Sequence, residues 1–153
     1  AGIIPCMSDL CVRVLRPPHP DLARCRALRR EVFILEQRVP ADIEVDGRDD
    51  ACVHFLAVHP DRGELGAARL RVTPSGVAKA ERVAVRATAR GTGVGRALMR
   101  ALEAEAKASG HLRVVLGAQM DAVPFYLRLG YQPVGRRYME AGIEHQTMER
   151  PLG

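Results

Sequence analysis

The chain has no tryptophan, and its 153 residues include only three phenylalanines and three tyrosines. Proteins that bind nucleic acid often stack bases on aromatic side chains, and few such platforms can be built from this composition. The formal net charge is +5, and Lys79 and Lys107 are the only lysines, so the positive charge is almost all arginine. Arginine forks bind phosphate and carboxylate well. The composition therefore disfavours nucleic acid and indicates a smaller polyanion as partner.

Long apolar runs are also missing from the sequence. No stretch of about eighteen apolar residues occurs, and the start lacks the basic and apolar regions of a secretory signal. The four cysteines form no C-x-x-C pair and have no histidine at zinc-finger spacing: Cys6, Cys11, Cys25 and Cys52. We therefore expect a cytoplasmic protein with free, buried thiols and without a membrane anchor, disulfide framework or metal site.

The length and the 47% hydrophobic content suit one domain with one sizeable core. Residues 1–8 fit no periodic pattern, and we interpret them as a leader or an engineered remnant, with Met7 as a candidate original start. The single domain is expected to span residues 9–153. We expect one active site.

The first half of the chain shows strand and helix periods in turn. Residues 11–15 alternate as a strand does, and the apolar residues that follow recur at helical spacing: Leu22, Cys25, Leu28, Val32 and Leu35. The acidic segment 38–50 is interpreted as an irregular loop. Strand-like runs at 52–59, 65–72 and 77–85 are joined by short turns with proline and glycine, which predicts an antiparallel meander.

The second half predicts a crossover through a helix. This helix follows Gly93 and ends at Gly110, with a polar face that carries Arg96, Arg100, Glu103 and Lys107. A strand at 113–116, a short helix at 123–129 and a last strand at 145–150 complete the pattern. The order predicts an α/β (α+β) fold with one mixed, mostly antiparallel sheet and helices on both faces.

The glycine-rich turn between strand and helix, residues 83–96, is the most informative segment. Glycines let backbone N–H groups turn inward, and a helix N-terminus adds unpaired donors and partial positive charge. Arg86, Arg90 and Arg96 crowd this helix start, where a bound polyanion would offset their unfavourable position. The turn is neither G-x-G-x-x-G nor a phosphate loop, which disfavours dinucleotide and ATP. A purely structural turn with solvated arginines remains the alternative.

Two ordered motifs resemble those of the GNAT acetyltransferases. Residues 90–95, RGTGVG, match the signature [QR]-x-x-G-x-[GA], and residues 119–131, QMDAVPFYLRLGY, resemble N-x-x-A-x-x-[FLY]-Y-x-x-x-G-[FY]. Gln119 departs from the pattern, since many members have Asn there. Further features resemble the ElaA or YjcF-like branch: residues 32–37 and 140–145, with Pro40, Asp46, Asp49 and His54. Together the matches extend from about Val32 to Arg150.

This resemblance implies a GNAT fold in which a splayed strand pair holds acetyl-CoA. The turn's backbone amides would cradle the coenzyme A pyrophosphate, and the edge of the preceding strand would pair with the pantetheine arm. The cofactor-binding residues so implied are Val83, Ala84, Val85, Arg90, Gly91, Thr92, Gly93, Val94, Gly95, Arg96, Gln119 and Tyr126.

The resemblance also suggests catalytic roles. Tyr126 matches the family tyrosine that protonates the departing thiolate, although a Tyr on a short apolar helix is otherwise a core aromatic. Glu81 is expected as the base that takes the amine proton through water, with a surface ion pair to Arg82 as the alternative. His145, His54 and Glu36 remain competing bases, because imidazole titrates near neutrality. A backbone N–H near Val85 would polarise the thioester carbonyl.

The acceptor pocket is expected at the end of the first helix and in the loop after it. Its candidate residues are Phe33, Glu36, Gln37, His54 and His145. The acidic run to Asp50 is a further candidate, because acidic residues suit a cationic amine, with a solvated loop as the alternative. The function so predicted is acetyl transfer to a primary amine of a small molecule or peptide, by direct attack in a ternary complex, with a monomer or homodimer as the working form. A non-catalytic acyl-CoA-binding sensor or interaction module is the alternative.

Overall fold

Eight strands form one sheet in the computed structural model, which describes residues 9–153. The strand order is β1-β2-β3-β4-β5-β8-β6, and β7 pairs with β8. The strands are β1 Cys11–Leu15, β2 Val53–His59, β3 Gly63–Val72, β4 Ala78–Val85, β5 Arg113–Gln119, β6 Gln132–Pro133, β7 Tyr138–Glu140 and β8 Ile143–Pro151. The antiparallel meander β2-β3-β4 is confirmed, whereas the short strands β6 and β7 were not predicted.

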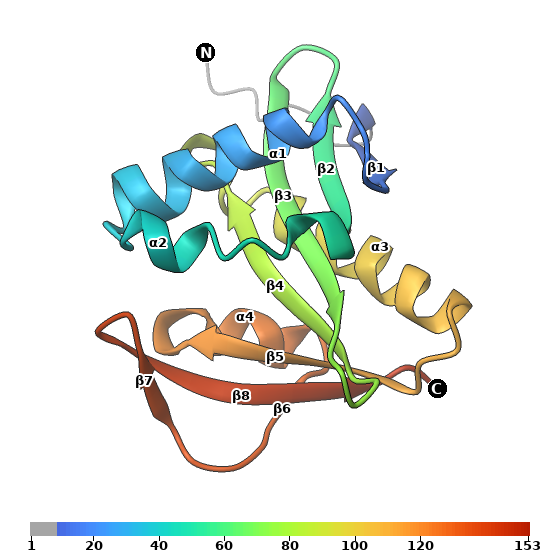
Figure 1. Ribbon diagram of the computed structural model, residues 1–153, viewed down its shortest axis with the longest axis vertical. Coiled ribbons are helices and arrows are strands. Elements are labelled where there is room, and N and C mark those ends of the chain that lie inside the picture. Colours follow the sequence, from blue (N-terminus) through green and yellow to red (C-terminus); the bar gives the residue numbers. More distant parts are fainter. Residues whose placement is uncertain (1–8) are drawn as a thin grey trace.

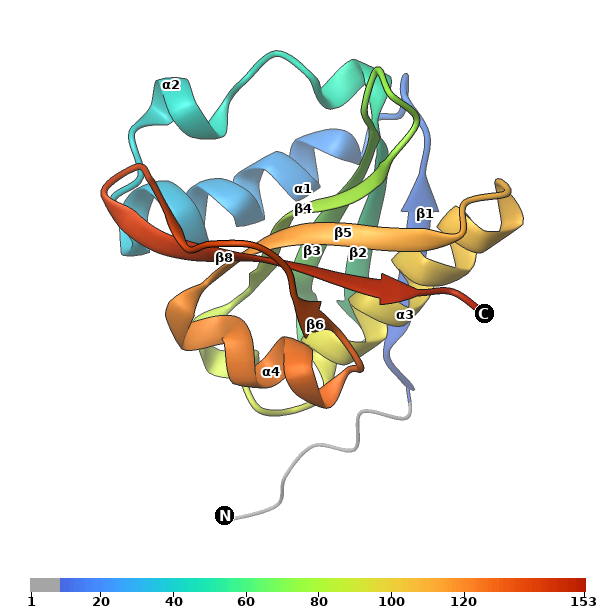
Figure 2. The ribbon, with the colours of Figure 1, turned by 90° about the horizontal axis from the view of Figure 1, so that it is seen from below.

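Helices cover both faces of this sheet, as Figures 1 and 2 show. The α-helices are α1 Leu22–Arg29, α2 Ala41–Glu44, α3 Val94–Ala108 and α4 Val123–Arg128. In Figure 2, α1 and α2 lie on one side of the sheet and α3 and α4 on the other. The predicted mixed sheet with helices on both faces is therefore confirmed. Within residues 9–153, no helix is long and apolar enough to cross a membrane.

The sheet parts between β4 and β5. These two strands are parallel, and they pair only at Ala78–Val114, Lys79–Val115 and Ala80–Leu116. Just beyond this pairing, the β3–β4 register shifts, and Arg82 takes a left-handed φ of 54°. A bulge bends its strand, so the second half of β4 turns away from β5. The structure thus contains the splayed strand pair that the sequence predicted.

The first predicted helix changes its winding halfway. After α1, residues Arg30–Glu36 form a π-helical segment (η2), and Gln37 N–H donates to the carbonyl of Val32, five residues earlier. Wider winding rotates later side chains off the helical face that α1 buries. Leu22, Cys25, Leu28 and Val32 are buried as predicted, but Leu35 is 63% exposed.

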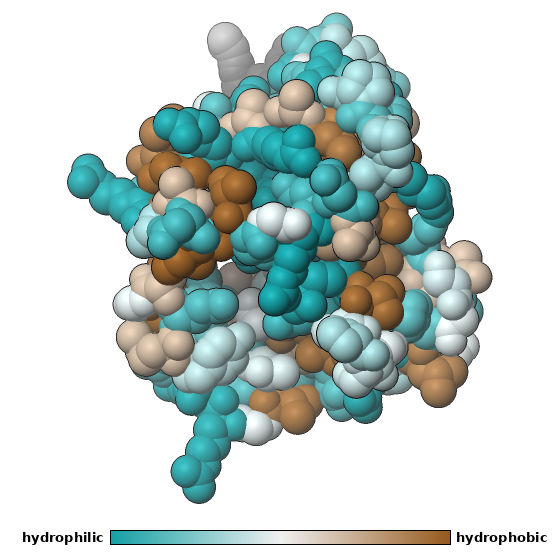
Figure 3. Space-filling model, viewed as in Figure 1, coloured by the Kyte–Doolittle hydropathy of each residue, from teal (hydrophilic) through white to brown (hydrophobic). Residues whose placement is uncertain are grey.

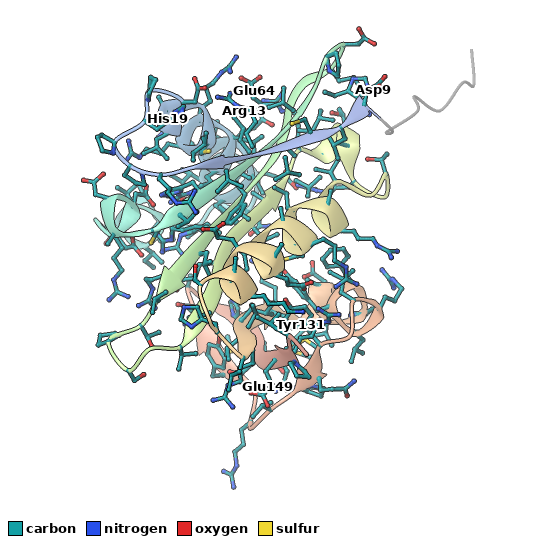
Figure 4. All side chains as sticks on the ribbon, turned by 90° about the vertical axis from the view of Figure 1, so that its right-hand side faces the viewer. Asp9, Arg13, His19, Glu64, Tyr131 and Glu149 are labelled. Carbon is teal, nitrogen blue, oxygen red and sulfur yellow. The ribbon has the colours of Figure 1, made fainter. Side chains whose placement is uncertain are left out.

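The main core lies between the sheet and α3. Leu98, Met99 and Leu102 on α3 are completely buried, and a Cβ at Gly66 on β3 would meet Leu98 and Val94 at 2.8 and 2.9 Å. Glu103, predicted on the solvated face, is instead buried, and it accepts a 2.7 Å hydrogen bond from the hydroxyl of Tyr131. Figure 4 shows Tyr131 beside α3. The helical pattern could not predict the burial of Glu103, because its partner Tyr131 lies 28 residues later in the chain.

The cysteines within residues 9–153 are free. Cys25 and Cys52 are buried as expected, whereas Cys11, the first residue of edge strand β1, is exposed. Burial raises the pKa of the Cys25 thiol to about 11, which keeps it protonated and unreactive at neutral pH. Cys6, Met7 and the rest of residues 1–8 lie outside the described part of the chain.

Candidate active site

A cavity of about 540 Å³ opens where β4 and β5 part. Its walls come from η2, from Glu81–Val85 on β4, from Leu116–Gln119 on β5, and from the β7–β8 hairpin. In Figure 3 the surface is hollowed between the α2 region and the β5–β8 region. These walls come from segments that are far apart in the sequence, so the cavity exists only in the folded chain.

A second cavity, of about 480 Å³, lies at the start of α3. Gly91 and Gly93 line it with φ values of 77° and 91°, a left-handed conformation that glycine adopts without strain. The two cavities share Val83, Val85, Arg90, Ala122 and Tyr126 in their walls. The glycine turn and the strand opening thus form one continuous site.

The arginines around the turn are not equivalent. Arg86 pairs with Glu31 at 2.9 Å, and Arg90 forms two hydrogen bonds to Glu36 at 2.6 and 2.7 Å. Arg96 and Arg128 also line the second cavity, and neither forms an ion pair within residues 9–153. Two guanidinium groups therefore stay available for an anion at this helix start.

Tyr126 lies where the two cavities meet, and only 7% of it is exposed. Its ring packs edge-on against Phe125 and Tyr131, with centroid distances of 4.9 and 5.7 Å. Burial raises the pKa of the Tyr126 hydroxyl well above its usual value, so the group stays protonated at neutral pH. A protonated hydroxyl held in this way can donate a hydrogen bond or a proton into the site.

Glu81 lines the first cavity, but two arginines bind its carboxylate. Oε1 accepts from Arg69 at 2.7 Å and from Arg71 at 2.9 Å, and Oε2 accepts from Arg71 at 3.1 Å. Burial raises the Glu81 pKa, but the hydrogen bonds and charges of Arg71 and Arg69 outweigh it and leave the pKa below its ordinary value. The alternative interpretation, a surface pair of Glu81 with Arg82, is wrong, because Arg82 binds Glu44 and Asp46 instead.

The acidic loop 38–50 is mostly exposed, but it is less irregular than predicted, because it contains α2 and buried arginines bind three of its carboxylates. Arg69 is fully buried, and it donates to Asp46 at 2.8 and 3.0 Å and to Asp49 at 2.9 Å. Arg29, also buried, binds Glu44 at 2.7 Å and Asp49 at 2.9 Å. The loop is therefore fixed against α1 and β3 by paired charges, which a local reading of its composition does not reveal.

Four of the five predicted acceptor residues line the first cavity: Phe33, Glu36, Gln37 and His145. Gln119 lines it too, and its amide donates to Gln37 at 2.9 Å. His54 does not belong to the lining; it is buried beside the acidic loop, where Nε2 lies 2.8 Å from the carbonyl oxygen of Asp49. Burial lowers the pKa of His54, with partial compensation from that carbonyl. The structure thus separates the two histidines.

Sequence reasoning missed several residues of the cavity wall, among them Tyr138 and Gly117. Tyr138 stacks on His145, with ring centroids 5.5 Å apart and planes at 22°. A Cβ at Gly117 would overlap the Tyr138 hydroxyl, so a larger residue there would displace the Tyr138 ring. A glycine inside the β-branched run of β5 was the available signal, because such a glycine often marks a close approach.

Comparisons with known proteins agree with this geometry. A family model described as an acetyltransferase (GNAT) domain matches residues 31–152. The chain is 38% identical over 122 residues to the uncharacterized N-acetyltransferase YjcF of Bacillus subtilis (strain 168), an alignment that covers 79% of this chain and 86% of YjcF.

Solved structures show the same fold. An acyl-CoA N-acyltransferase from Pseudomonas aeruginosa superposes with a TM-score of 0.78 at 32% identity, over 92% of this chain and 99% of that one. Escherichia coli ElaA superposes with a TM-score of 0.78 at 29% identity and the same coverage. The chain therefore belongs to the GNAT superfamily, as an N-acetyltransferase of its ElaA/YjcF-like branch that transfers acyl groups from coenzyme A.

Proposed function

We propose that the protein transfers an acetyl group from acetyl-CoA to a primary amine of a small molecule or peptide, by direct attack in a ternary complex. The observation that carries the proposal is the parting of β4 and β5 at Ala80–Leu116, with the Tyr126 hydroxyl between the glycine-turn cavity and the larger cavity. One substrate can enter from each side and meet at the tyrosine. Cys11, Cys25 and Cys52 do not line either cavity, so none of them is in position to form an acyl-enzyme. This supports direct attack by the amine.

The glycine turn would hold the coenzyme A pyrophosphate. At the start of α3, unpaired backbone N–H groups and the positive end of the helix dipole would stabilise a bound anion. Arg96 and Arg128 add positive charge there, and Arg90 can do so if it leaves Glu36. The β4 edge at Val83–Val85 has no β5 partner, so its backbone groups are available for the pantetheine amides and for the thioester carbonyl.

The transfer itself breaks one bond and forms one. The amine nitrogen attacks the thioester carbon, the C–S bond breaks, and the thiolate leaves as it receives a proton from Tyr126. The nitrogen loses its second proton as the amide forms, and this proton restores the Tyr126 hydroxyl through solvent. The attacking ammonium must first lose a proton to a base. Glu36, Glu44 and Glu81 in the larger cavity are all bound by arginine, whereas Asp121 and Glu140 form no ion pair with arginine or lysine within residues 9–153. Those two carboxylates would attract a cationic acceptor.

Binding and turnover test the proposal separately. Calorimetric titration should show saturable binding of acetyl-CoA, and no binding of NADH or ATP. Thiol release with a panel of primary amines, namely spermidine, tyramine, an amino-acid amide and a lysine peptide, should then identify acceptors. A protein that binds acetyl-CoA but acetylates none of them would be an acyl-CoA-binding module and not a transferase.

Tyr126→Phe tests the acid role. The variant should keep its affinity for acetyl-CoA and lose about 100-fold or more in kcat, since only the proton donor is removed. Tyr131→Phe is the matched control, because its hydroxyl donates to Glu103 and not into a cavity. Equal kcat for wild type and Tyr126→Phe would exclude Tyr126 as the acid.

A further inference from the structure

The tautomer of His145 is set by the backbone beside it. Nδ1 lies 2.7 Å from the carbonyl oxygen of Ile143. A carbonyl oxygen only accepts hydrogen bonds, so Nδ1 carries the ring hydrogen, and Nε2 of the neutral ring carries the lone pair. His145 lines the larger cavity and is 8% exposed. A nitrogen able to accept a proton is therefore present in the cavity wall.

The orientation of the His145 ring is fixed from two sides. On β8 it lies between Gln119 of β5 and Tyr138 of β7 in the strand register, and the Tyr138 ring stacks on it. Tyr138 can take this position only because residue 117 is glycine. Residues of three strands, β5, β7 and β8, thus fix the orientation of the His145 imidazole at the cavity.

Glu140 completes the surroundings of the lone pair. Its Oε2 lies 3.9 Å from Nε2 of His145, on a side chain that is 60% exposed and lines the cavity. A carboxylate at this distance stabilises an imidazolium once it forms. The remaining titratable group packed on the ring is Tyr138, and Gln119, on the β5 side, is neutral.

Glu81, the base expected from the sequence, is in a different state. Its carboxylate already accepts three hydrogen bonds from Arg69 and Arg71. A proton placed there would break these bonds in a buried site, whereas a proton on His145 Nε2 breaks none. The contrast between the two residues decides which one can take the proton.

We propose that His145 is the general base, and that its Nε2 accepts the proton of the acceptor ammonium while Glu140 stabilises the resulting imidazolium. The inference rests on the proposed acetyl transfer. The amine lone pair that the proton leaves behind attacks the thioester carbon, and the thiolate leaves with the Tyr126 proton. The attacking nitrogen loses its second proton as the C–S bond breaks, and this proton restores the Tyr126 hydroxyl through solvent. The proton on His145 returns to solvent after product release. Glu81 then serves as a positioning residue that keeps β4 in place.

The closing experiment compares His145→Gln with His111→Gln. His111 lies between α3 and β5, outside the cavity lining, so it is a matched control. With the best acceptor of the amine panel, His145→Gln should lower kcat/KM at pH 7 by about 100-fold or more. Its Kd for acetyl-CoA, measured by calorimetry, should not change. His111→Gln should match wild type.

The pH profile separates a base from a structural histidine. Without a base the acceptor must arrive already neutral, so the rate of His145→Gln should rise about tenfold per pH unit from 7 to 9, towards the ordinary pKa of an amine near 10.4. The wild type should change much less over that range, because its base takes the ammonium proton within the site. A constant ratio of the two rates at all pH values would overturn the assignment.

A spectroscopic measurement tests the tautomer without turnover. Long-range ¹H–¹⁵N spectra of the full chain should show His145 as the Nδ1–H form at pH 8, and an Nε2–H form would overturn the assignment. If wild type binds acetyl-CoA but acetylates no amine, the proposed function fails, and the base assignment falls with it. If wild type acetylates an amine and His145→Gln does so equally well, only the base assignment fails.

Discussion

Arg90 of the glycine turn and Glu36 at the end of η2 form a two-pronged ion pair, with N–O distances of 2.6 and 2.7 Å. The hydrogen bond from Arg90 lowers the pKa of Glu36, so the carboxylate is charged at neutral pH. The pair joins the side of the site that would take the pyrophosphate to the side that would take the acceptor. Both side chains are more than 40% exposed, so the pair can open at small cost.

Removing Glu36 should therefore favour the cofactor. In Glu36→Gln the Arg90 guanidinium no longer has a carboxylate partner and can turn to the pyrophosphate, which should tighten acetyl-CoA binding by about two- to fivefold, equivalent to roughly 0.4–1 kcal/mol. Calorimetry measures the change. Glu31→Gln, which breaks the similar pair with Arg86 outside both cavity linings, should leave the Kd unaltered. Weaker binding by Glu36→Gln would show that the pair supports the cofactor site.

Gly117→Ala should disturb the larger cavity through Tyr138. The new methyl group overlaps the Tyr138 hydroxyl, so the ring must leave its stack on His145, and kcat/KM should fall about tenfold or more. The double variant Gly117→Ala/Tyr138→Phe should recover much of the loss, because without the hydroxyl the nearest ring carbon is 3.4 Å away, an ordinary contact. Failure of the double variant to recover would place the defect in β5 itself.

Arg69→Met should be one of the most destabilising substitutions in the chain. Arg69 is fully buried, and it binds the carboxylates of Asp46, Asp49 and Glu81. Loss of the cation leaves these groups uncompensated, so the free energy of unfolding should drop by about 3–5 kcal/mol in urea titrations. Arg113→Met is the control: Arg113 is exposed and pairs with Glu149 at 3.7 Å, so its loss should cost less than about 0.5 kcal/mol.

The same charge network predicts how stability depends on pH. Hydrogen bonds from Arg69 lower the pKa of Asp46, and the charge and hydrogen bonds of Arg29 and Arg69 outweigh burial and lower that of Asp49. A carboxyl group whose pKa is lowered in the folded state stabilises the fold at pH values above its ordinary pKa of 3.8. This stabilisation is lost as the pH falls below that value. The free energy of unfolding should therefore change little from these groups between pH 7 and 5 and fall steeply below about pH 4.

Asp46→Asn checks that assignment. The variant should be less stable than wild type at pH 7, and its stability should fall less steeply with acid, since one of the protonating groups is gone. Urea unfolding at pH 7, 5, 4 and 3 measures both. Asp61→Asn, a change in the turn between β2 and β3, is the control and should leave the wild-type slope in place. An unchanged slope in Asp46→Asn would remove Asp46 from the acid transition.

Much of the fold could be predicted because its signals are local. Strand alternation at Cys11–Leu15, the turns of the β2–β3–β4 meander and the glycines before α3 each depend on neighbouring residues. The left-handed φ values of Gly91 and Gly93 follow from the same short segment that gave the family resemblance. The sequence by itself determined the order of the main strands and helices, the family and the place of the glycine turn.

Tertiary structure decided the state of each charged group in the site. The sequence shows Glu81, His54 and His145 equally as titratable side chains. In the folded chain, Arg69 and Arg71 bind the Glu81 carboxylate. His54 is buried beside the acidic loop, whereas His145 lines the cavity. Likewise, the π-helical winding exposes Leu35, and Glu103 is buried where it accepts the hydrogen bond of Tyr131. Burial and pairing set protonation, and some partners are distant in the chain: Arg71 lies 10 residues from Glu81, and Gln37 lies 82 residues from Gln119. Local sequence patterns carry no information about which distant groups will meet, and so only the packed chain fixes the chemistry.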